Sequence, residues 1–104
     1  MAPYCASKGA VLMLTRALTV DHGRDGIRVN YVCPSIPDTP LVRKALGAGP
    51  EDDLSSFGLE GLDINSPEQV ARHMLFLASD ESTNINGAAQ VVDFCGLARS
   101  TFPL

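Results

Sequence analysis

Met1 to Val20 read MAPYCASKGAVLMLTRALTV, and this stretch decides the fold. Proline suits the first turn of a helix, because its missing N–H would have no intrahelical partner there, so Pro3 marks a helix start. Gly23 follows Asp21 and His22 and is expected to end the helix in a left-handed conformation. The sequence therefore predicts a helix from about Pro3 to about His22.

Tyr4 and Lys8 stand four residues apart in this helix, a spacing that places both side chains on one face. A phenol titrates near 10 in water. An ammonium about 4 Å away favours the phenolate by about 4 kcal/mol at an effective dielectric near 20, but by about 1 kcal/mol in bulk water. The pair can exchange protons near neutral pH only if it is shielded, and an isolated Y-x-x-x-K is more often an ordinary exposed pair.

The composition limits the classes of function. The chain of 104 residues is 45% hydrophobic, 19% charged and carries a net charge of −4, which indicates one globular unit. A negative chain without a basic patch argues against nucleic acid or an anionic membrane surface as partner. The apolar run Ala10–Val20 is too short to span a bilayer. Three cysteines without metal-ligand spacing predict free thiols, a cytoplasmic location and no metal site.

The rest of the chain alternates strands and helices. Residues 27–33 (IRVNYVC) are typical of a short buried strand that Pro34 ends. Leu41 to Leu46 would form a short helix that Gly47 ends. Ser66 is a good N-cap with proline next to it and Gln69 at the capping-box position, so a helix is expected from there, and Asp80 to Ser82 would end it. Residues 88–94 (AAQVVDF) would form the last strand, parallel to the first. The order helix, strand, loop, helix, strand predicts an α/β fold.

Motifs along most of the chain resemble the short-chain dehydrogenase/reductase family. They are Tyr4 to Val11, Leu14 to Leu18, Gly26 to Asn30, Pro34, Thr39 to Leu41, Ser66 to Ala71, Leu75 to Ser82, Ile85 to Gly87, and Val92 with Asp93. The resemblance implies the C-terminal part of a Rossmann-like, doubly wound parallel sheet, with residues 1–104 belonging to one domain. Residues 1–33 would be the catalytic helix and strand, 34–65 the cofactor and substrate loop, and 66–104 the last helix and strand.

The resemblance implies an NAD(P)-dependent oxidoreductase that transfers hydride between nicotinamide and a carbonyl or alcohol substrate. Tyr4 would be the acid and base at the reacting oxygen. Lys8 would assist it by favouring the phenolate, and would bind the ribose hydroxyls of the cofactor. The choice between NAD and NADP is not readable from these residues.

The cofactor loop would begin where the strand over residues 27–33 ends, which is where open α/β sheets bind ligands. In the family this loop reads P-G-x-x-x-T; peptide groups after the proline contact the nicotinamide carboxamide, and the threonine hydroxyl helps to hold the cofactor. Pro34, Ile36 and Thr39 match that pattern. Ser35 stands where glycine is usual, and only glycine freely adopts a positive φ.

In the family, the glycine-rich phosphate loop, an Asn-Ala-Gly segment and a catalytic serine precede the tyrosine, whereas three residues precede Tyr4 here. We therefore expect a truncated form that binds cofactor and substrate when an N-terminal half completes it, in a homo-oligomer or mixed oligomer. The alternative is a non-catalytic fragment or an oligomerisation partner of a full-length relative. The wide apolar surface of the first helix, which needs covering on two sides, favours that alternative.

Overall fold

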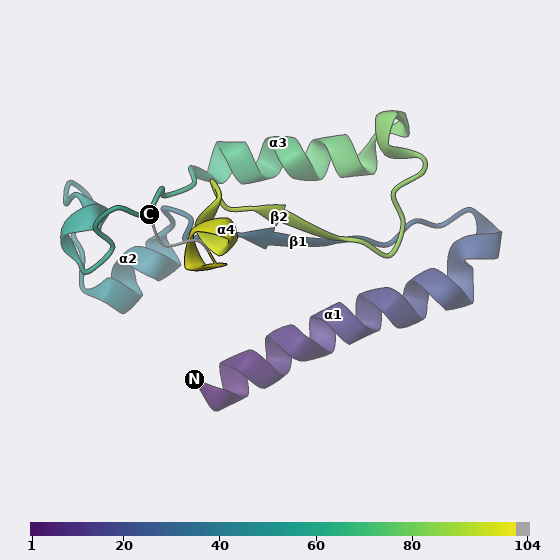
Figure 1. Cartoon of the computed structure of the whole chain (residues 1–104), viewed down its shortest axis with the longest axis horizontal. Coiled ribbons are helices and arrows are strands. Elements are labelled where there is room, and N and C mark those ends of the chain that lie inside the picture. The colour runs from purple at the N-terminus through teal and green to yellow at the C-terminus, as the bar shows by residue number, and fades with distance from the viewer. Residues whose placement is uncertain (102–104) are drawn as a thin grey trace. The chain divides into compact units, whose positions relative to one another are not determined.

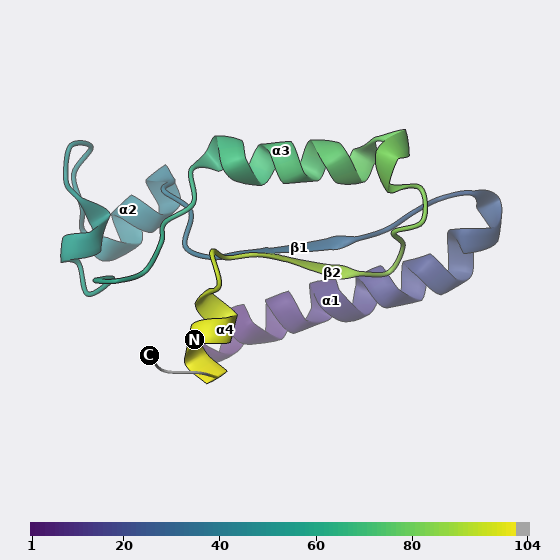
Figure 2. The same cartoon turned by 45° about the horizontal axis from the view of Figure 1, so that its top comes forward.

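The computed structural model describes the backbone of residues 1–101 and the side chains of residues 1–98. Its helices and strands are α1 (Ala2–His22), β1 (Tyr31–Pro34), α2 (Pro40–Leu46), α3 (Pro67–Ala78), β2 (Ala89–Val92) and α4 (Gly96–Thr101) (Figure 1). Within this part of the chain, β1 and β2 pair in a two-stranded sheet and lie side by side in the same direction in both views (Figure 2). The expected α/β class is confirmed.

Two compact units divide the chain. The first comprises Met1–Cys33 and Met74–Val91, and the second comprises Pro34–His73 and the residues from Val92 onward. The expectation of one domain over residues 1–104 stays a prediction. Over the described residues, no helix has both the length and the apolar character that crossing a membrane requires.

The end of α1 differs from the expectation. Gly23 was expected to be left-handed, and this is wrong: its φ is −59° and ψ −34°, and the backbone continues as a 3₁₀ turn to Asp25. Gly26 takes the left-handed conformation instead, with φ 77°. Its N–H donates to the Gly23 carbonyl at 3.2 Å, and the Ile27 N–H donates to the His22 carbonyl at 3.4 Å. The 3₁₀ turn thus moves the left-handed stop beyond the first available glycine.

β1 is shorter than the strand expected over residues 27–33 and begins at Tyr31. Before it, the Gly87 N–H donates to the Val29 carbonyl at 2.8 Å, and side-chain amides make the other bonds. The Val29 N–H donates to Asn86 Oδ1 at 2.9 Å, and Asn30 Oδ1 accepts a backbone N–H just before β2 at 3.1 Å. These bonds satisfy the backbone without a regular ladder, so the strand pattern in the sequence overestimates the strand.

α3 begins as the sequence predicts. The Ser66 N–H donates to Gln69 Oε1 at 2.8 Å, and the Gln69 N–H donates to Ser66 Oγ at 3.2 Å. This reciprocal pair is a capping box, which satisfies N–H groups that have no intrahelical partner. The expected start of this helix is confirmed.

Thr19 anchors α1 within the first unit. Its hydroxyl lies 2.8 Å from the Thr15 carbonyl and 3.1 Å from the Val29 carbonyl. Gly87 packs against the same threonine, because a Cβ on Gly87 would lie 3.0 Å from Thr19 Cγ2. Gly87 also has φ +74°, so both the conformation and the close approach require glycine there.

Arg28 holds the C-terminal end of α3. Its Nη1 donates to the Ser82 carbonyl at 2.8 Å, to Ser82 Oγ at 3.0 Å and to the Ile85 carbonyl at 3.1 Å. Its Nη2 donates to the carbonyls of Leu77 at 2.8 Å and Ser79 at 3.0 Å. The last carbonyls of a helix lack intrahelical partners, and a cation is favourable near them. One guanidinium therefore closes the helix end and the turn after it.

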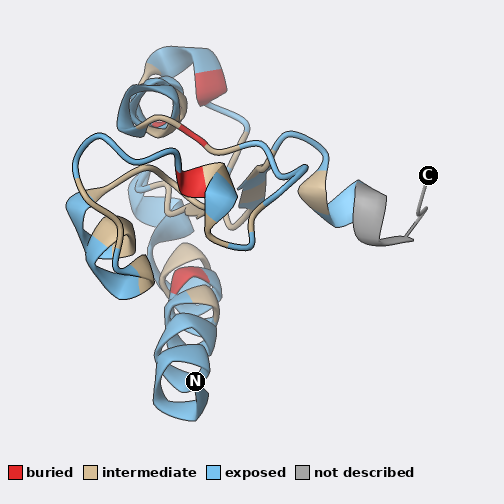
Figure 3. Ribbon diagram, turned by 90° about the vertical axis from the view of Figure 1, so that its left-hand side faces the viewer, coloured by how far each residue is buried: buried red, intermediate tan, exposed pale blue. Residues whose placement is uncertain are grey.

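Apolar burial is small in the described chain. The buried hydrophobic side chains are Leu54 and Leu77, whereas Met13 and Leu14 of α1 are 58% and 56% exposed. Figure 3 shows α1 almost entirely in the colour of exposed residues, with a buried band that corresponds to Thr15. The apolar surface of α1 that was expected to be covered on two sides is therefore open.

We predict that Arg28→Met lowers the free energy of unfolding by about 2–4 kcal/mol, because each hydrogen bond to a charged group contributes about 1.5–3 kcal/mol and the variant loses all the bonds that the guanidinium donates. Urea denaturation measures this change. Arg24→Met is the matched control, since Arg24 is exposed in the neighbouring 3₁₀ turn and its loss should change stability by less than about 0.5 kcal/mol. Equal unfolding midpoints for the two variants would contradict the role of Arg28.

Candidate functional site

α1 brings Tyr4 and Lys8 together. The Nζ of Lys8 lies 5.4 Å from the centroid of the Tyr4 ring, within the range of a cation–π interaction. Tyr4 is 59% exposed, and Lys8 is exposed as well. Ser7 Oγ donates to the Tyr4 carbonyl at 2.7 Å within the same turn. The spacing of four thus gives the juxtaposition that helix geometry dictates, and the pair faces solvent.

The other expected site residues lie in the second unit: Pro34 is the last residue of β1, and Ser35, Ile36 and Thr39 follow it in the loop before α2. The Ser35 N–H donates to the Val92 carbonyl at 3.0 Å, and Ser35 Oγ donates to the Asp63 carbonyl at 3.2 Å. Among the described residues other than glycine, positive φ values occur at Phe94 and Cys95, so Ser35 has an ordinary backbone conformation. Serine at this position therefore costs no backbone strain.

Asn65 organises this loop, and it is 1% exposed. Its N–H donates to the Ile36 carbonyl at 3.0 Å, and its carbonyl accepts the Asp38 N–H at 2.9 Å. Its Nδ2 donates to Ser35 Oγ at 2.7 Å and to the Val92 carbonyl at 2.8 Å. Sequence reasoning missed Asn65 because its partners are distant in the chain, and no local pattern marks a buried amide of this kind.

Thr39 begins α2. Its Oγ1 accepts the Val42 N–H at 3.3 Å, and Gly47 ends the helix with φ 73°, as expected from the sequence. The cap uses an acceptor site of the Thr39 hydroxyl, so its proton stays available for donation. Over the described residues, the Ile36 N–H donates to no acceptor, so it is also available to a ligand. The loop therefore offers two hydrogen-bond donors to a ligand, the Ile36 N–H and the Thr39 hydroxyl.

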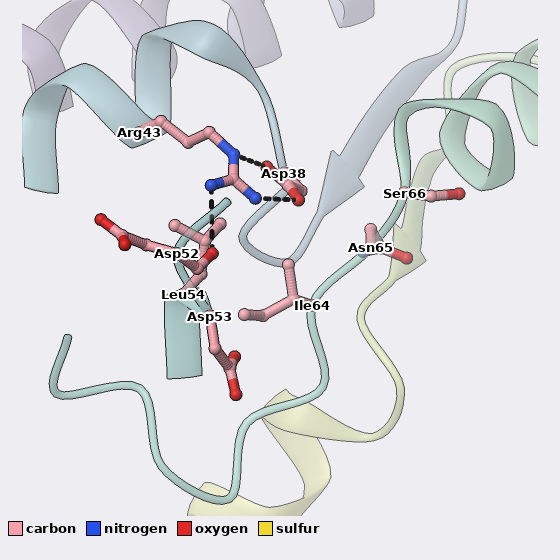
Figure 4. A pocket seen from close by; sticks show the side chains of 8 residues that line it. All are labelled: Asp38, Arg43, Asp52, Asp53, Leu54, Ile64, Asn65 and Ser66. Atoms are coloured by element: carbon pink, nitrogen blue, oxygen red, sulfur yellow. Dashed lines mark hydrogen bonds and ion pairs between the residues drawn. The ribbon is translucent and has the colours of Figure 1, made fainter. Parts of the chain in front are cut away.

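Asp38 and Arg43 form an ion pair beside this loop, with Nε to Oδ1 at 2.6 Å and Nη2 to Oδ2 at 2.8 Å. The Arg43 hydrogen bond lowers the pKa of the Asp38 carboxyl, and Asp38 raises the pKa of the guanidinium in return. The pair borders a cavity of about 350 Å³ (Figure 4). The lining residues are Asp38, Arg43, Asp52, Asp53, Leu54, Ile64, Asn65 and Ser66.

The acidic run before Leu54 starts a turn. Asp53 Oδ1 accepts the Ser55 N–H at 2.9 Å, which lowers the pKa of Asp53 and caps the 3₁₀ helix Leu54–Ser56. Within the described residues, no group of three or more His, Cys, Asp or Glu side chains could hold a metal ion. The three cysteines are free thiols, as expected.

We predict that the Asp38 carboxyl titrates below the ordinary value of about 3.9 and that Arg43→Met returns it there. Because the folded pKa is lowered, the pair stabilises the fold above pH about 3.9 and loses this contribution as pH falls through the lower folded value. The ¹³C shift of the Asp38 carboxyl, followed by NMR from pH 6 to pH 2, measures the midpoint. A midpoint that Arg43→Met leaves unchanged would contradict the guanidinium as the cause.

Known proteins match nearly the whole chain. A family model described as enoyl-(acyl carrier protein) reductase matches residues 1–97. Meso-2,3-butanediol dehydrogenase from Serratia marcescens is 45% identical over 95 residues, which cover 88% of this chain and 36% of that enzyme. The chain thus spans little more than a third of the length of this curated relative.

Solved structures share the fold. A C-terminal deletion mutant of Thermoplasma acidophilum aldohexose dehydrogenase superposes with a TM-score of 0.80 and 36% identity, covering 94% of this chain and 46% of that chain. A 4-hydroxyisoleucine dehydrogenase solved with NADH gives a TM-score of 0.65 and 26% identity, covering 88% of this chain and 37% of that chain. These neighbours confirm the expected α/β fold, a part of a Rossmann-like parallel sheet.

Proposed function

Because this chain belongs to the short-chain dehydrogenase/reductase family, we propose that it is the C-terminal part of an oxidoreductase that uses NAD or NADP. The reaction would transfer a hydride between nicotinamide and a small carbonyl or alcohol. The observation that carries this proposal is the pairing of Tyr4 with Lys8 on α1, with Nζ 5.4 Å from the ring centroid. The neighbour solved with NADH supports a nicotinamide cofactor.

In this mechanism Tyr4 holds the proton that moves. In the reductive direction, Tyr4 Oη donates a proton to the carbonyl oxygen of the substrate; in the oxidative direction, it accepts the proton of the alcohol. The nicotinamide supplies or accepts the hydride when it is bound. The positive charge of Lys8 favours the phenolate form of the tyrosine, and its ammonium is also a donor for the ribose hydroxyls.

The loop after β1 would orient the cofactor through Pro34, Ser35, Ile36 and Thr39. Pro34 ends β1, and the Ser35 side chain is turned toward the Asp63 carbonyl and Asn65. The Ile36 N–H and the Thr39 hydroxyl are the donors this loop offers. Ordinary backbone geometry at Ser35 removes the conformational objection to serine where glycine is usual.

The proposed mechanism also requires that the Tyr4 and Lys8 pair be shielded from water. Tyr4 is 59% exposed, and in water a nearby ammonium favours the phenolate by only about 1 kcal/mol. The 104 residues contain no glycine-rich phosphate loop of the form G-x-G-x-x-G. We therefore propose that turnover needs a polypeptide that supplies this loop and covers the pair.

We predict turnover when the chain is co-expressed with the N-terminal part of meso-2,3-butanediol dehydrogenase, assayed with NADH or NADPH and a panel of ketones. Tyr4→Phe should then lower kcat by about 10²–10⁴-fold, the usual range for general acid–base catalysis. Tyr31→Phe is the matched control, since it removes a phenol on β1, away from Lys8 in the sequence. Turnover that survives Tyr4→Phe would rule out the assigned acid and base.

The alternative function is that of a non-catalytic fragment or oligomerisation partner of a full-length relative. Exposed apolar side chains on α1 favour it; among them, Val20 is 81% exposed and Met13 is 58% exposed. Contiguous apolar surface of this kind commonly marks an interaction site.

For this alternative, we predict that co-expression with full-length meso-2,3-butanediol dehydrogenase gives a mixed oligomer, visible by native mass spectrometry. Met13→Lys should abolish it, because a charge would have to be buried in the contact. Lys44→Ala, on the exposed surface of α2, is the control. Recovery of only homomeric enzyme would contradict this function.

A further inference from the structure

Arg43 uses every nitrogen of its guanidinium. Nε and Nη2 donate to the two carboxylate oxygens of Asp38 at 2.6 and 2.8 Å, and Nη1 donates to the carbonyls of Gly49 at 2.5 Å and Asp52 at 3.1 Å. Its side chain is 20% exposed. Figure 4 shows the guanidinium between the Asp38 carboxylate and the backbone at Asp52. The side chain is thus fully engaged and mostly shielded.

The two ends of this contact belong to different segments. Asp38 lies in the loop after β1, where its N–H is bonded to the Asn65 carbonyl at 2.9 Å. Gly49 and Asp52 form a turn after α2, closed by the Gly49 N–H to Asp52 Oδ2 at 2.6 Å. Arg43 therefore clamps the turn at residues 49–52 onto the loop that contains Thr39.

The geometry favours arginine specifically. An exposed ion pair usually contributes little to stability. A bidentate pair with a carboxylate is stronger and fixes orientation, because a planar fork of donors matches two oxygens. Lysine has one nitrogen and cannot hold both oxygens of Asp38 and two carbonyls in one plane. A lysine at position 43 would keep the charge and lose the clamp.

We propose that Arg43 is a positioning residue for the cofactor loop: its pairing with Asp38 fixes Thr39, and its bonds to Gly49 and Asp52 hold the neighbouring turn against that loop. The part that concerns cofactor rests on the proposed function of Thr39. The clamp itself needs no cofactor, so the two parts are tested separately.

Amide hydrogen exchange of the 104-residue chain tests the clamp. Arg43→Met and Arg43→Lys should both speed exchange at the hydrogen-bonded amides of Ala48, Gly49 and Asp52 by about tenfold or more, the loss expected for charge-assisted hydrogen bonds. Lys44→Met, which removes a charge from the same helix, should leave these amides within about twofold of wild type. Exchange at Tyr31 and Gly87 of the first unit should not change in any variant.

Three results would overturn the clamp. The first is an amide exchange rate in this turn that is the same in Arg43→Lys as in wild type. The second is a rise in the exchange rate at Tyr31 and Gly87 as large as that in the turn, which would mean a general loss of stability. The third is unprotected exchange at the amides of Ala48, Gly49 and Asp52 in wild type, since there would then be no ordered turn to hold.

NADH binding tests the cofactor part, using the chain co-expressed with the N-terminal part of meso-2,3-butanediol dehydrogenase and following NADH fluorescence. Arg43→Lys should raise the Kd by about tenfold, the effect of losing a bidentate contact, and leave kcat at saturating NADH within about threefold. Tyr4→Phe should instead lower kcat and leave the Kd for NADH nearly unchanged. An unchanged Kd in Arg43→Lys would overturn the cofactor part. Absence of NADH binding by wild type would overturn the proposed function and this part with it, while the exchange result would still decide the clamp.

Discussion

The first unit depends on the hydrogen bonds that the Arg28 guanidinium donates to backbone carbonyls. A parallel pair of strands needs a crossover, and here α3 and the turn after it provide that crossover. The end of a crossover helix presents carbonyls that no helical N–H can reach. Arg28 donates to the carbonyls of Leu77 and Ser79 at the end of α3 and to those of Ser82 and Ile85 in the turn after it. Ser82, which also accepts from Arg28 through its hydroxyl, is fully buried. One side chain before β1 therefore fixes where the chain leaves α3 and returns to β2.

This dependence follows from the small apolar core. Full burial of a leucine contributes about 1.5–3 kcal/mol, and the described chain has two buried hydrophobic side chains, Leu54 and Leu77. Directional contacts at Arg28, Asn65 and Arg43 therefore carry a large share of the order. Polar networks specify one geometry more narrowly than apolar contact does, since each partner has a fixed direction. The surface of α1 agrees with this, because Met13, Leu14 and Val20 are exposed and add little apolar burial.

Local chemistry made the helix boundaries readable from sequence. The Ser66 and Gln69 pair, and the left-handed Gly47 after α2, are motifs whose parts lie within a few residues of each other. The same reasoning failed at Gly23, because Gly26 lies three residues further on and can take the left-handed position equally well, as it does here. α4 was also missed, since Phe94 and Cys95 reach φ 48° and 62° before it, and neither residue type announces that conformation.

The candidate site shows the same contrast between pairs whose geometry the local sequence fixes and pairs whose geometry it does not. Tyr4 and Lys8 could be paired from sequence alone, because a helix fixes the relation of positions four apart. The Asp38 and Arg43 pair could not, since a spacing of five across a helix N-terminus has no fixed geometry.

Ser35 shows how a residue that departs from the family pattern can still fit its loop. Its φ lies outside the positive range, so a glycine there would serve close approach rather than conformation. Its hydroxyl bonds to the segment around Asn65, which also holds the backbone of Ile36 and Asp38. The loop after β1 is therefore tied at its start by Ser35 and at its end by Arg43. Between these ties lie the Ile36 N–H and the Thr39 hydroxyl, and donors held in place before a ligand arrives lose less entropy when they bind it.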